Sequence, residues 1–272
     1  MKKMRYLFWN THKNKKINPI LCNLISENHI SIVVLAEYDA DAEEEIKMLN
    51  TCGYSMQQYT TTGCERIHIL AKRGLDIEPQ LQTSNSSMQF VNRDIILCCV
   101  HLNSQIYSSG SHAREIRIRQ IVSDILKAEK ELSTTNTVIV GDLNINPYDQ
   151  SCISAQYLHG IPIYEETKRN SRVVAGETFY MFYNPMWNFL GDFSEPFGTY
   201  YYNSSDDVNT YWNIFDQVII RPTLRRRFVQ KSLKILTGTE KISLLNSKRH
   251  PNCEISDHLP IIFEIKENDH EF

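Results

Sequence analysis

The segment VIVGDLNINP (138–147) places a carboxylate and an amide directly after a run of apolar residues. The run that precedes Gly141 is typical of a strand covered on both faces. The chain is expected to stay extended beyond it, so that Asp142 and Asn144 lie on the same side, because side chains alternate along a strand. Gly141 leaves room for a close backbone neighbour, and Pro147 ends strand pairing soon afterwards. A structural role is also open, since Asp or Asn after a strand often forms an Asx turn.

Other apolar runs in the chain also end in polar side chains. Each of these residues, taken alone, is explained by a turn, a solvated strand end or a histidine with a satisfied structural role. Taken together, they raise the question of what chemistry they could share. Besides Asp142 and Asn144, the residues are Asn10, Glu37, His101, Asp216, Asp257 and His258.

Asp216 is the hardest of these residues to explain by a structural role alone. It lies inside the apolar run NIFDQVII (213–220), where an ionised carboxylate is costly without a partner. His258 is the best candidate partner, because it precedes the last apolar run. A carboxylate on one ring nitrogen would fix the tautomer of His258 and leave the other nitrogen for a substrate.

Three of the carboxylates, those of Glu37, Asp142 and Asp257, fit a common role in metal binding. A small number of hard oxygen ligands suits Mg²⁺ or Mn²⁺, which keep water ligands and contact substrate phosphates directly. The pattern indicates metal-assisted hydrolysis of a phosphate ester. The sequence contains no P-loop, no G-x-S-x-G and no H-E-x-x-H motif, which removes three common alternatives.

The elements that must position these residues are mostly short apolar strands, which outnumber the helices. This proportion favours an α/β sandwich, in which two packed sheets are flanked by helices. The continuous patterning, without repeats or linkers, favours a single domain over residues 1–272. Strands are expected over 5–10, 30–37, 54–59, 66–72, 87–92, 94–101, 136–141, 213–220 and 259–265, and helices over 17–29, 41–50 and 112–132.

Six motifs along the chain resemble those of the endonuclease/exonuclease/phosphatase superfamily, in the order that this family shows. They are WNTH (9–12), LAEYD (35–39), VHLNS (100–104), VIVGDLNINP (138–147), IFDQVII (214–220) and ISDHLPI (255–261). The family includes exonuclease III, apurinic endonucleases, deoxyribonucleases, neutral sphingomyelinases, inositol polyphosphate phosphatases and tyrosyl-DNA phosphodiesterases. The resemblance implies a four-layer α/β sandwich with two mixed sheets inside, helices outside and the active site at one edge.

The resemblance also implies a metal site and an activated water. Glu37 corresponds to the main ligand of Mg²⁺ or Mn²⁺, with Asn10 nearby and Asp257 contributing directly or through water. Asp142 corresponds to the residue that orients and deprotonates the attacking water. Asn144 would help to hold that water or the phosphate.

Further matched positions would contact the phosphate. His258 would donate a hydrogen bond to a phosphoryl oxygen, and Asp216 would orient His258. His101 matches a histidine that several phosphodiesterases and phosphatases of the family place near the phosphate. Asn103 and Ser104 are weaker matches for substrate binding.

The chain departs from the apurinic endonucleases, which carry a tyrosine motif where this sequence has VHLNS (100–104). The VHLNS form is nearer to the tyrosyl-DNA phosphodiesterase and sphingomyelinase branches. No run is long enough to span a membrane, which makes a sphingomyelin substrate less favoured. The stretch 178–212 holds thirteen of the twenty-eight aromatic residues and matches no one subfamily. It predicts either packing on the core or a wall that stacks on bases.

The charged residues and the cysteines bear on two questions: whether the protein attracts nucleic acid, and in which compartment it lies. The net charge of −3 gives no global attraction to nucleic acid, although three basic clusters lie at 111–120, 221–228 and 247–250. Each cluster is explained by a solvated surface. Lys248 and Arg249 are the best candidates for substrate contact, because the SDH motif follows them. Seven cysteines without a C-x-x-C pair, and no signal peptide, favour a cytoplasmic protein.

Three functions are compatible with these residues. The first is a metal-dependent phosphodiesterase that acts on nucleic acid, as a nuclease or end-processing enzyme. The second is a phosphatase or phosphodiesterase for a small molecule or lipid headgroup, which would use the same residues. The third is a catalytically silent binding module, which predicts a missing catalytic group, whereas every expected group is present. None of the motifs predicts an oligomeric state.

Overall fold

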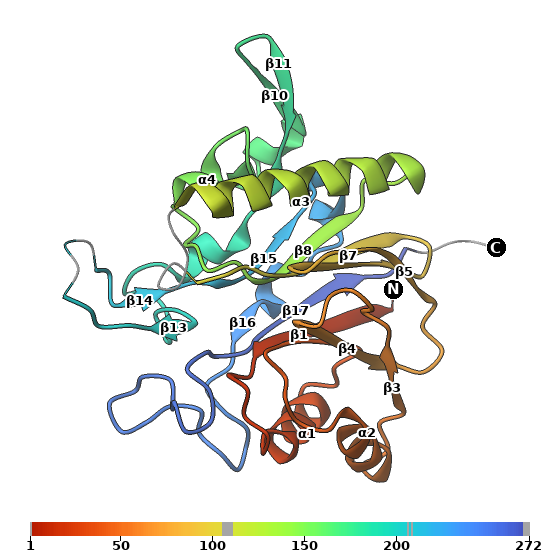
Figure 1. The fold of residues 1–272 in the computed structure, drawn as a ribbon, viewed down its shortest axis with the longest axis vertical. Coiled ribbons are helices and arrows are strands. Elements are labelled where there is room, and N and C mark those ends of the chain that lie inside the picture. Colours follow the sequence, from red (N-terminus) through yellow and green to blue (C-terminus); the bar gives the residue numbers. More distant parts are fainter. Residues whose placement is uncertain (1, 105–110, 206, 208, 269–272) are drawn as a thin grey trace.

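Two large mixed sheets pack face to face between two layers of helices (Figure 1). This computed structural model describes residues 2–104, 111–205, 207 and 209–268, with the side chains of 111 and 112 excepted. Helices α1 and α2 cover the outer face of one sheet, and α3 and α4 lie over the other. The helices are α1 (Asn18–Glu27), α2 (Ala42–Thr51), α3 (Ser111–Glu131) and α4 (Gln150–Ile153). The expected α/β sandwich is confirmed.

The first sheet brings the two ends of the chain together. Near its middle, β1 pairs in parallel with β2 on one side and antiparallel with β17 on the other. Six strands form it, in the order β16 (Lys234–Ile235), β17 (Ile261–Lys266), β1 (Lys3–Asn10), β2 (Ile32–Ala36), β4 (Ile67–Lys72) and β3 (Met56–Tyr59).

The second sheet has β7 and β8 in parallel near its middle, and β15 runs antiparallel beside β8. Its seven strands follow the order β5 (Ile77–Gln82), β6 (Ser86–Val91), β7 (Ile95–His101), β8 (Thr137–Asp142), β15 (Asp216–Ile220), β12 (Phe182–Tyr183) and β9 (Gly160–Ile161). Two further hairpins are formed by β10 (Ser171–Val174) with β11 (Glu177–Tyr180), and by β13 (Tyr200–Tyr201) with β14 (Trp212–Asn213).

Strand β8 shows how the sequence pattern produces this layering. Val138 and Val140 join the hydrophobic cluster between the two sheets, whereas Ile139 packs in the cluster that includes α3. Both faces of the strand are therefore buried, as its continuous apolar run predicts. By the same alternation, Asp142 faces the layer between the sheets, where that layer reaches its end.

The predicted strands are present with shifts of a few residues at their ends, except that the run 213–220 is divided. Asn213 ends β14, and β15 begins at Asp216. The two residues between these strands, Ile214 and Phe215, bond to the segment that follows β8. The amide of Ile214 donates to the side chain of Asn146, and the carbonyl of Phe215 accepts from the amide of Leu143. The short strands β5, β9 to β13 and β16 were not expected.

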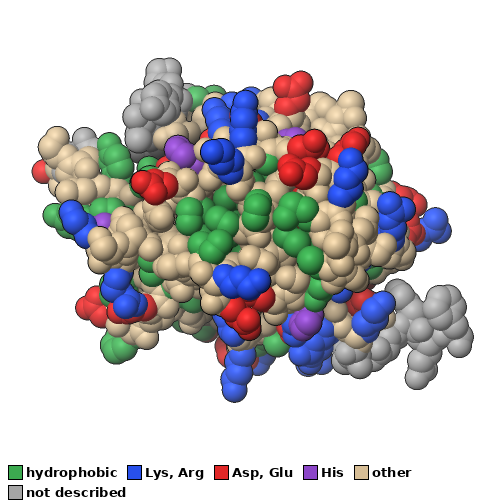
Figure 2. All heavy atoms as spheres, turned by 90° about the horizontal axis from the view of Figure 1, so that it is seen from below, with side chains coloured by type: hydrophobic (Ala, Val, Ile, Leu, Met, Phe, Trp, Pro, Cys, Tyr) green, Lys and Arg blue, Asp and Glu red, His purple; other side chains and the backbone are tan. Residues whose placement is uncertain are grey.

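The outer face that carries α1 and α2 has acidic and basic side chains interspersed around a hydrophobic patch (Figure 2). It therefore presents no single basic surface. Each of the seven cysteines has a free thiol. Within the part of the chain that the structure describes, no helix is both long enough and apolar enough to cross a bilayer.

Helix α2 buries a carboxylate that has no partner. The side chain of Asp41 caps the helix by accepting from the amides of Glu43 and Glu44. Glu45 in the same turn faces inward, is 0% exposed, and makes no side-chain hydrogen bond. Burial, followed by the charge of Glu44, raises the pKa of Glu45 from 4.5 to about 8. The folded protein therefore holds this proton across a pH range in which the unfolded chain releases it.

This buried acid should make stability fall as pH rises from about 4.5 to about 8, because only the folded state then binds the proton. We expect the free energy of unfolding to drop by roughly 3–5 kcal/mol across that range. Glu45→Met should remove the slope and stabilise the protein at pH 8. Urea unfolding at several pH values measures this, with Glu45→Gln as the uncharged control. An equal slope in wild type and both variants would contradict the assignment.

Candidate active site

Three polar side chains lie on one rung of the second sheet. His101 at the end of β7 pairs in register with Asp142 at the end of β8, and Asp142 pairs with Asp216 at the start of β15. Side chains on one rung point to the same face, and here that face is the layer between the two sheets. All three residues are buried. The rung therefore closes one end of the hydrophobic interior with two carboxylates and an imidazole.

The first sheet contributes Asn10 and Glu37 to the same place. The Nδ2 of Asn10, at the end of β1, donates to Oδ2 of Asp142 at 3.0 Å, and its Oδ1 accepts from the amide of His12 at 3.0 Å. Glu37 follows β2 with φ at 48°, in the left-handed region that non-glycine residues rarely adopt. Its carbonyl accepts from the hydroxyl of Thr11 at 2.7 Å, which holds this conformation. Its Oε1 lies 3.5 Å from Nε2 of His101.

His258 makes the predicted pair with Asp216. Its Nδ1 lies 2.8 Å from Oδ2 of Asp216, while its Nε2 lies 3.9 Å from Oδ2 of Asp142. The backbone of His258 is fixed on both sides, because its carbonyl accepts from the indole of Trp9 and its amide donates to the hydroxyl of Ser256. With Nδ1 held by Asp216, Nε2 lies between Asp142 and Asp257, 3.9 Å and 4.0 Å from their oxygens.

Burial and charge set different protonation states for the two histidines. Burial opposes the charging of His258, but Asp216 and Asp142 outweigh it and raise its pKa from 6.5 to about 10. For His101, burial dominates over Asp142 and Glu37, so its pKa is lowered. At neutral pH the site therefore holds one imidazolium and one neutral imidazole.

Asp142 has a raised pKa and a carboxylate fixed in place. Burial raises its pKa above the ordinary value of 3.8, against the opposing charge of His258. Its Oδ1 accepts from the amide of Asn144 at 2.9 Å, and its Oδ2 accepts from Asn10. Hydrogen bonds to both oxygens fix the plane of the carboxylate.

The prediction that the chain stays extended beyond Asp142 is wrong. Asn144 has φ at 49°, and its amide donates to the side chain of Asp142. This is an Asx turn, the alternative structural role of Asp142. The Nδ2 of Asn144 donates to the carbonyl of Leu102 at 2.9 Å. Asn144 thus ties the ends of β8 and β7 together.

Gly141 provides the predicted room, and the neighbour is β7. A Cβ atom at this position would lie 1.8 Å from the carbonyl oxygen of Val100, its partner in the strand register. The clash is with backbone in the middle of the sheet, so no side-chain rotation relieves it.

We therefore expect Gly141→Ala to lower the free energy of unfolding by roughly 3 kcal/mol or more, because β7 and β8 must separate. Urea unfolding measures the loss. Gly176→Ala is the control for backbone strain without a clash, since that glycine has φ at 86° but no atom within 4 Å of its Cβ position. A Gly141→Ala protein as stable as this control would contradict the packing argument.

The expected metal ligands lie around the mouth of this cluster. The carboxylates of Glu37 and Asp257 are 27% and 22% exposed, and Asp257 lies 4.0 Å from Nε2 of His258. In the described residues, the tight group of potential ligands is instead the buried set of Asp142, Asp216 and His258, in which Asp216 and His258 are bonded to each other. Partly solvated carboxylates fit a hard cation that keeps its waters, so Glu37 and Asp257 suit Mg²⁺ or Mn²⁺. Asn10 lies nearby but is 2% exposed, and its amide already bonds to Asp142 and to the amide of His12.

The candidate substrate-binding residues are more scattered. Oδ1 of Asn103 accepts from the guanidinium of Arg66, which lies close enough to lower the pKa of His101. Ser104 is partly buried. Arg249 forms an exposed ion pair with Glu195, and Lys248 beside it is exposed. Arg66 was missed, because a lone arginine in a loop carries no signal in the sequence.

Two arginines of the basic cluster 221–228, Arg221 and Arg227, make contacts within the fold, whereas Arg226 is exposed. Arg221 is buried, forms an ion pair with Glu129 of α3 at 2.8 Å, and lies 3.8 Å from the ring of Phe182. Arg227 bonds to Asp94 through both amino groups. These contacts fasten the end of β15 to its neighbours.

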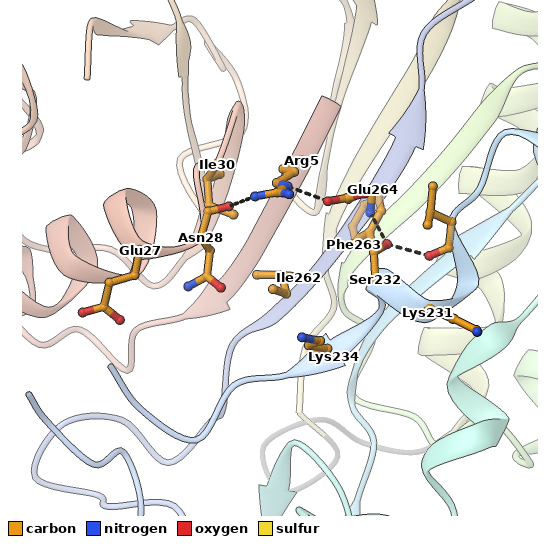
Figure 3. Close-up of a pocket in the computed structure, with 11 residues that line it drawn as sticks. Arg5, Glu27, Asn28, Ile30, Lys231, Ser232, Lys234, Ile262, Phe263 and Glu264 are labelled. Carbon is orange, nitrogen blue, oxygen red and sulfur yellow. Dashed lines mark hydrogen bonds and ion pairs between the residues drawn. The ribbon is translucent and has the colours of Figure 1, made fainter. Parts of the chain in front are cut away.

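A separate cavity of about 320 Å³ lies beside residues 262–264 of β17, with Arg5 of β1 and Lys234 of β16 in its wall (Figure 3). Arg5 in its wall bonds to Glu264 and donates to the carbonyl of Asn28 at 3.1 Å. Its lining includes none of the candidate site residues. This cavity is therefore separate from the cluster of His101, Asp142, Asp216 and His258.

The aromatic stretch 178–212 divides into two parts. Phe182 and Tyr183 belong to the buried clusters, which is the packing role. Tyr200, in contrast, lies beside the site with its ring 4.7 Å from that of His258. The sequence indicated this stretch but could not single out Tyr200.

Comparisons with known proteins give matches by structure alone. No family model and no curated protein matches the sequence. The 3' phosphatase NExo from Neisseria, bound to a product DNA hairpin, has a TM-score of 0.55 at 14% identity, covering 97% of this chain and 100% of its own. Truncated TDP2 from Caenorhabditis elegans gives 0.55 at 14%, with 97% and 98% covered. An endonuclease/exonuclease/phosphatase family protein from Bacteroides thetaiotaomicron gives 0.55 at 9%, with 97% and 98% covered. The chain therefore has the fold of the endonuclease/exonuclease/phosphatase superfamily.

Proposed function

We propose that this protein is a divalent-metal-dependent phosphodiester hydrolase that acts on nucleic acid, as a nuclease or end-processing enzyme. The observation that carries the proposal is the rung of His101, Asp142 and Asp216 facing the His258 imidazolium. This arrangement places a buried base, Asp142, 3.9 Å from a charged donor, Nε2 of His258. Support also comes from the folds it resembles, one of which was solved as a 3' phosphatase with a DNA hairpin.

The residues divide the work of hydrolysis in the following way. Asp142 orients the attacking water and accepts its proton, a role for which its raised pKa and fixed plane suit it. His258 donates Nε2–H to a nonbridging phosphoryl oxygen and neutralises the charge that develops there. Asp216 holds Nδ1 of His258 and so keeps the ring oriented.

His101 and the candidate metal ligands complete the arrangement. A lowered pKa keeps His101 neutral. It can therefore donate one ring N–H to the phosphate without adding a second positive charge beside the metal. Glu37 would hold Mg²⁺ or Mn²⁺, with Asn10 nearby and Asp257 contributing directly or through water. The bound cation would stabilise negative charge on the phosphoryl group.

The test is a screen with Mg²⁺ against single-stranded DNA, duplex DNA, RNA and small phosphoesters, followed by chelation with EDTA. We expect cleavage of at least one nucleic acid, complete loss with EDTA, and recovery when Mg²⁺ or Mn²⁺ is added. Cleavage confined to small phosphoesters would overturn the nucleic-acid assignment and support a small-molecule phosphatase. Full activity in EDTA would overturn the metal dependence.

A further inference from the structure

The hairpin of β13 and β14 is attached to both members of the His258–Asp216 pair. Tyr200 of β13 forms a bridge with His258, and the carbonyl of Thr199 accepts from the amide of Leu259 at 2.8 Å. The hydroxyl of Thr199 accepts from the amide of Asp216 at 3.2 Å. Whatever lies on this hairpin is therefore held at a fixed position relative to the imidazolium.

The two faces of the hairpin have different environments. On one face, Tyr201 stacks on His250 with 3.5 Å between ring centroids and meets Trp212 edge-on at 5.5 Å. These contacts bind the hairpin to the segment that carries Lys248 and Arg249. Because side chains alternate along a strand, Tyr200 and Tyr202 lie on the other face.

The rings of His258, Tyr200 and Tyr202 form a row that leads from the candidate site to solvent. The centroid of Tyr200 is 4.7 Å from that of His258, 5.3 Å from Phe215 and 6.4 Å from Tyr202, and the Tyr200 and Tyr202 rings are only 23° from parallel. Tyr200 is partly buried, whereas Tyr202 is 40% exposed. Burial first, and then the charge of Asp257, raises the pKa of Tyr200 to about 12, so its phenol stays neutral.

We propose that the Tyr200–Tyr202 face binds an unpaired nucleobase of a single-stranded nucleic acid, next to the phosphate that His258 contacts. This inference rests on the proposed function. A phosphodiester in a nucleic acid has a flat base within one nucleotide of the scissile bond, and aromatic faces bind such bases without selecting their sequence. A base in a duplex has both faces stacked already, so the face selects single-stranded segments.

The experiment removes the exposed ring of Tyr202 from the protein and, separately, the base from the substrate. Wild type and Tyr202→Ala are compared on a single-stranded oligonucleotide, and on the same oligonucleotide with an abasic analogue beside the scissile phosphate. We expect Tyr202→Ala to raise KM roughly tenfold on the first substrate, with kcat within about twofold, and to have little effect on the second. Tyr202→Phe keeps the ring and should restore KM.

Tyr180→Ala is the matched control, because Tyr180 is 56% exposed on the separate hairpin of β10 and β11. An equal effect of Tyr202→Ala on both substrates, or none on either, would overturn the base-binding role while the enzyme remains a nuclease. If wild type cleaves neither oligonucleotide but hydrolyses small phosphoesters, the proposed function itself fails. The two failures are therefore distinguishable.

Discussion

Asp142→Asn is expected to lower kcat by roughly 10³-fold or more on any substrate that the wild type hydrolyses. An amide cannot accept the proton of the attacking water. It also cannot accept from both Asn10 and the amide of Asn144, so one donor is left facing the new NH₂ group. Part of this cost is offset because the variant no longer buries a charge. The free energy of unfolding should therefore change by no more than about 2 kcal/mol.

Single-turnover kinetics at saturating Mg²⁺ measure the chemical step, and urea unfolding confirms that the fold persists. Asp124→Asn is the matched control, because Asp124 bonds to Gln120 within α3, outside the candidate site. The control should keep the wild-type rate. Activity of Asp142→Asn within tenfold of wild type would remove Asp142 from the role of base.

His258→Ala should affect both rate and stability. We expect kcat to fall by roughly 10²- to 10³-fold, because the donor to the phosphoryl oxygen is lost. Asp216 is 0% exposed and would keep a buried carboxylate with neither oxygen satisfied, which costs about 3–5 kcal/mol of stability. The double variant Asp216→Asn/His258→Ala should regain much of the stability and none of the activity.

The pH dependence of unfolding separates these contributions further. The folded pKa of His258, about 10, lies above its ordinary value of 6.5, so the stabilisation by the charged pair is complete below pH 6.5 and lost as pH rises through 10. Urea unfolding of wild type and His258→Ala between pH 6 and 10 measures this. A difference in stability that stays constant over that range would show that His258 acts in the fold only by packing.

Much of the sandwich follows from periodicity, because continuous apolar runs such as 136–141 can be buried only between two layers. Asp216 and His258 were paired from sequence, since a carboxylate inside an apolar run requires a partner. The short strands β9 to β13 were not predictable, because two to four residues carry no periodic signal and their pairing depends on the rest of the fold.

The positions of Asn144 and Tyr200 show a second limit of prediction from sequence. Alternation assumes an extended chain, but the amide of Asn144 gains a bond to Asp142 by turning. Tyr200 lies among many aromatic residues, and only the bridge to His258 distinguishes it from its neighbours. Both depend on contacts between residues that local patterns do not connect.

The pairing of β1 with β17 has a consequence for synthesis of the protein. Asn10 leaves the ribosome long before Ser256, whose hydroxyl donates to the Asn10 carbonyl across 246 residues of sequence, and before the nearby His258. A nascent chain therefore has no assembled active site until β17 is free to insert beside β1, and such long-range pairing is slow. The proposed hydrolytic site therefore cannot act while the segment between β1 and β17 is still being synthesised.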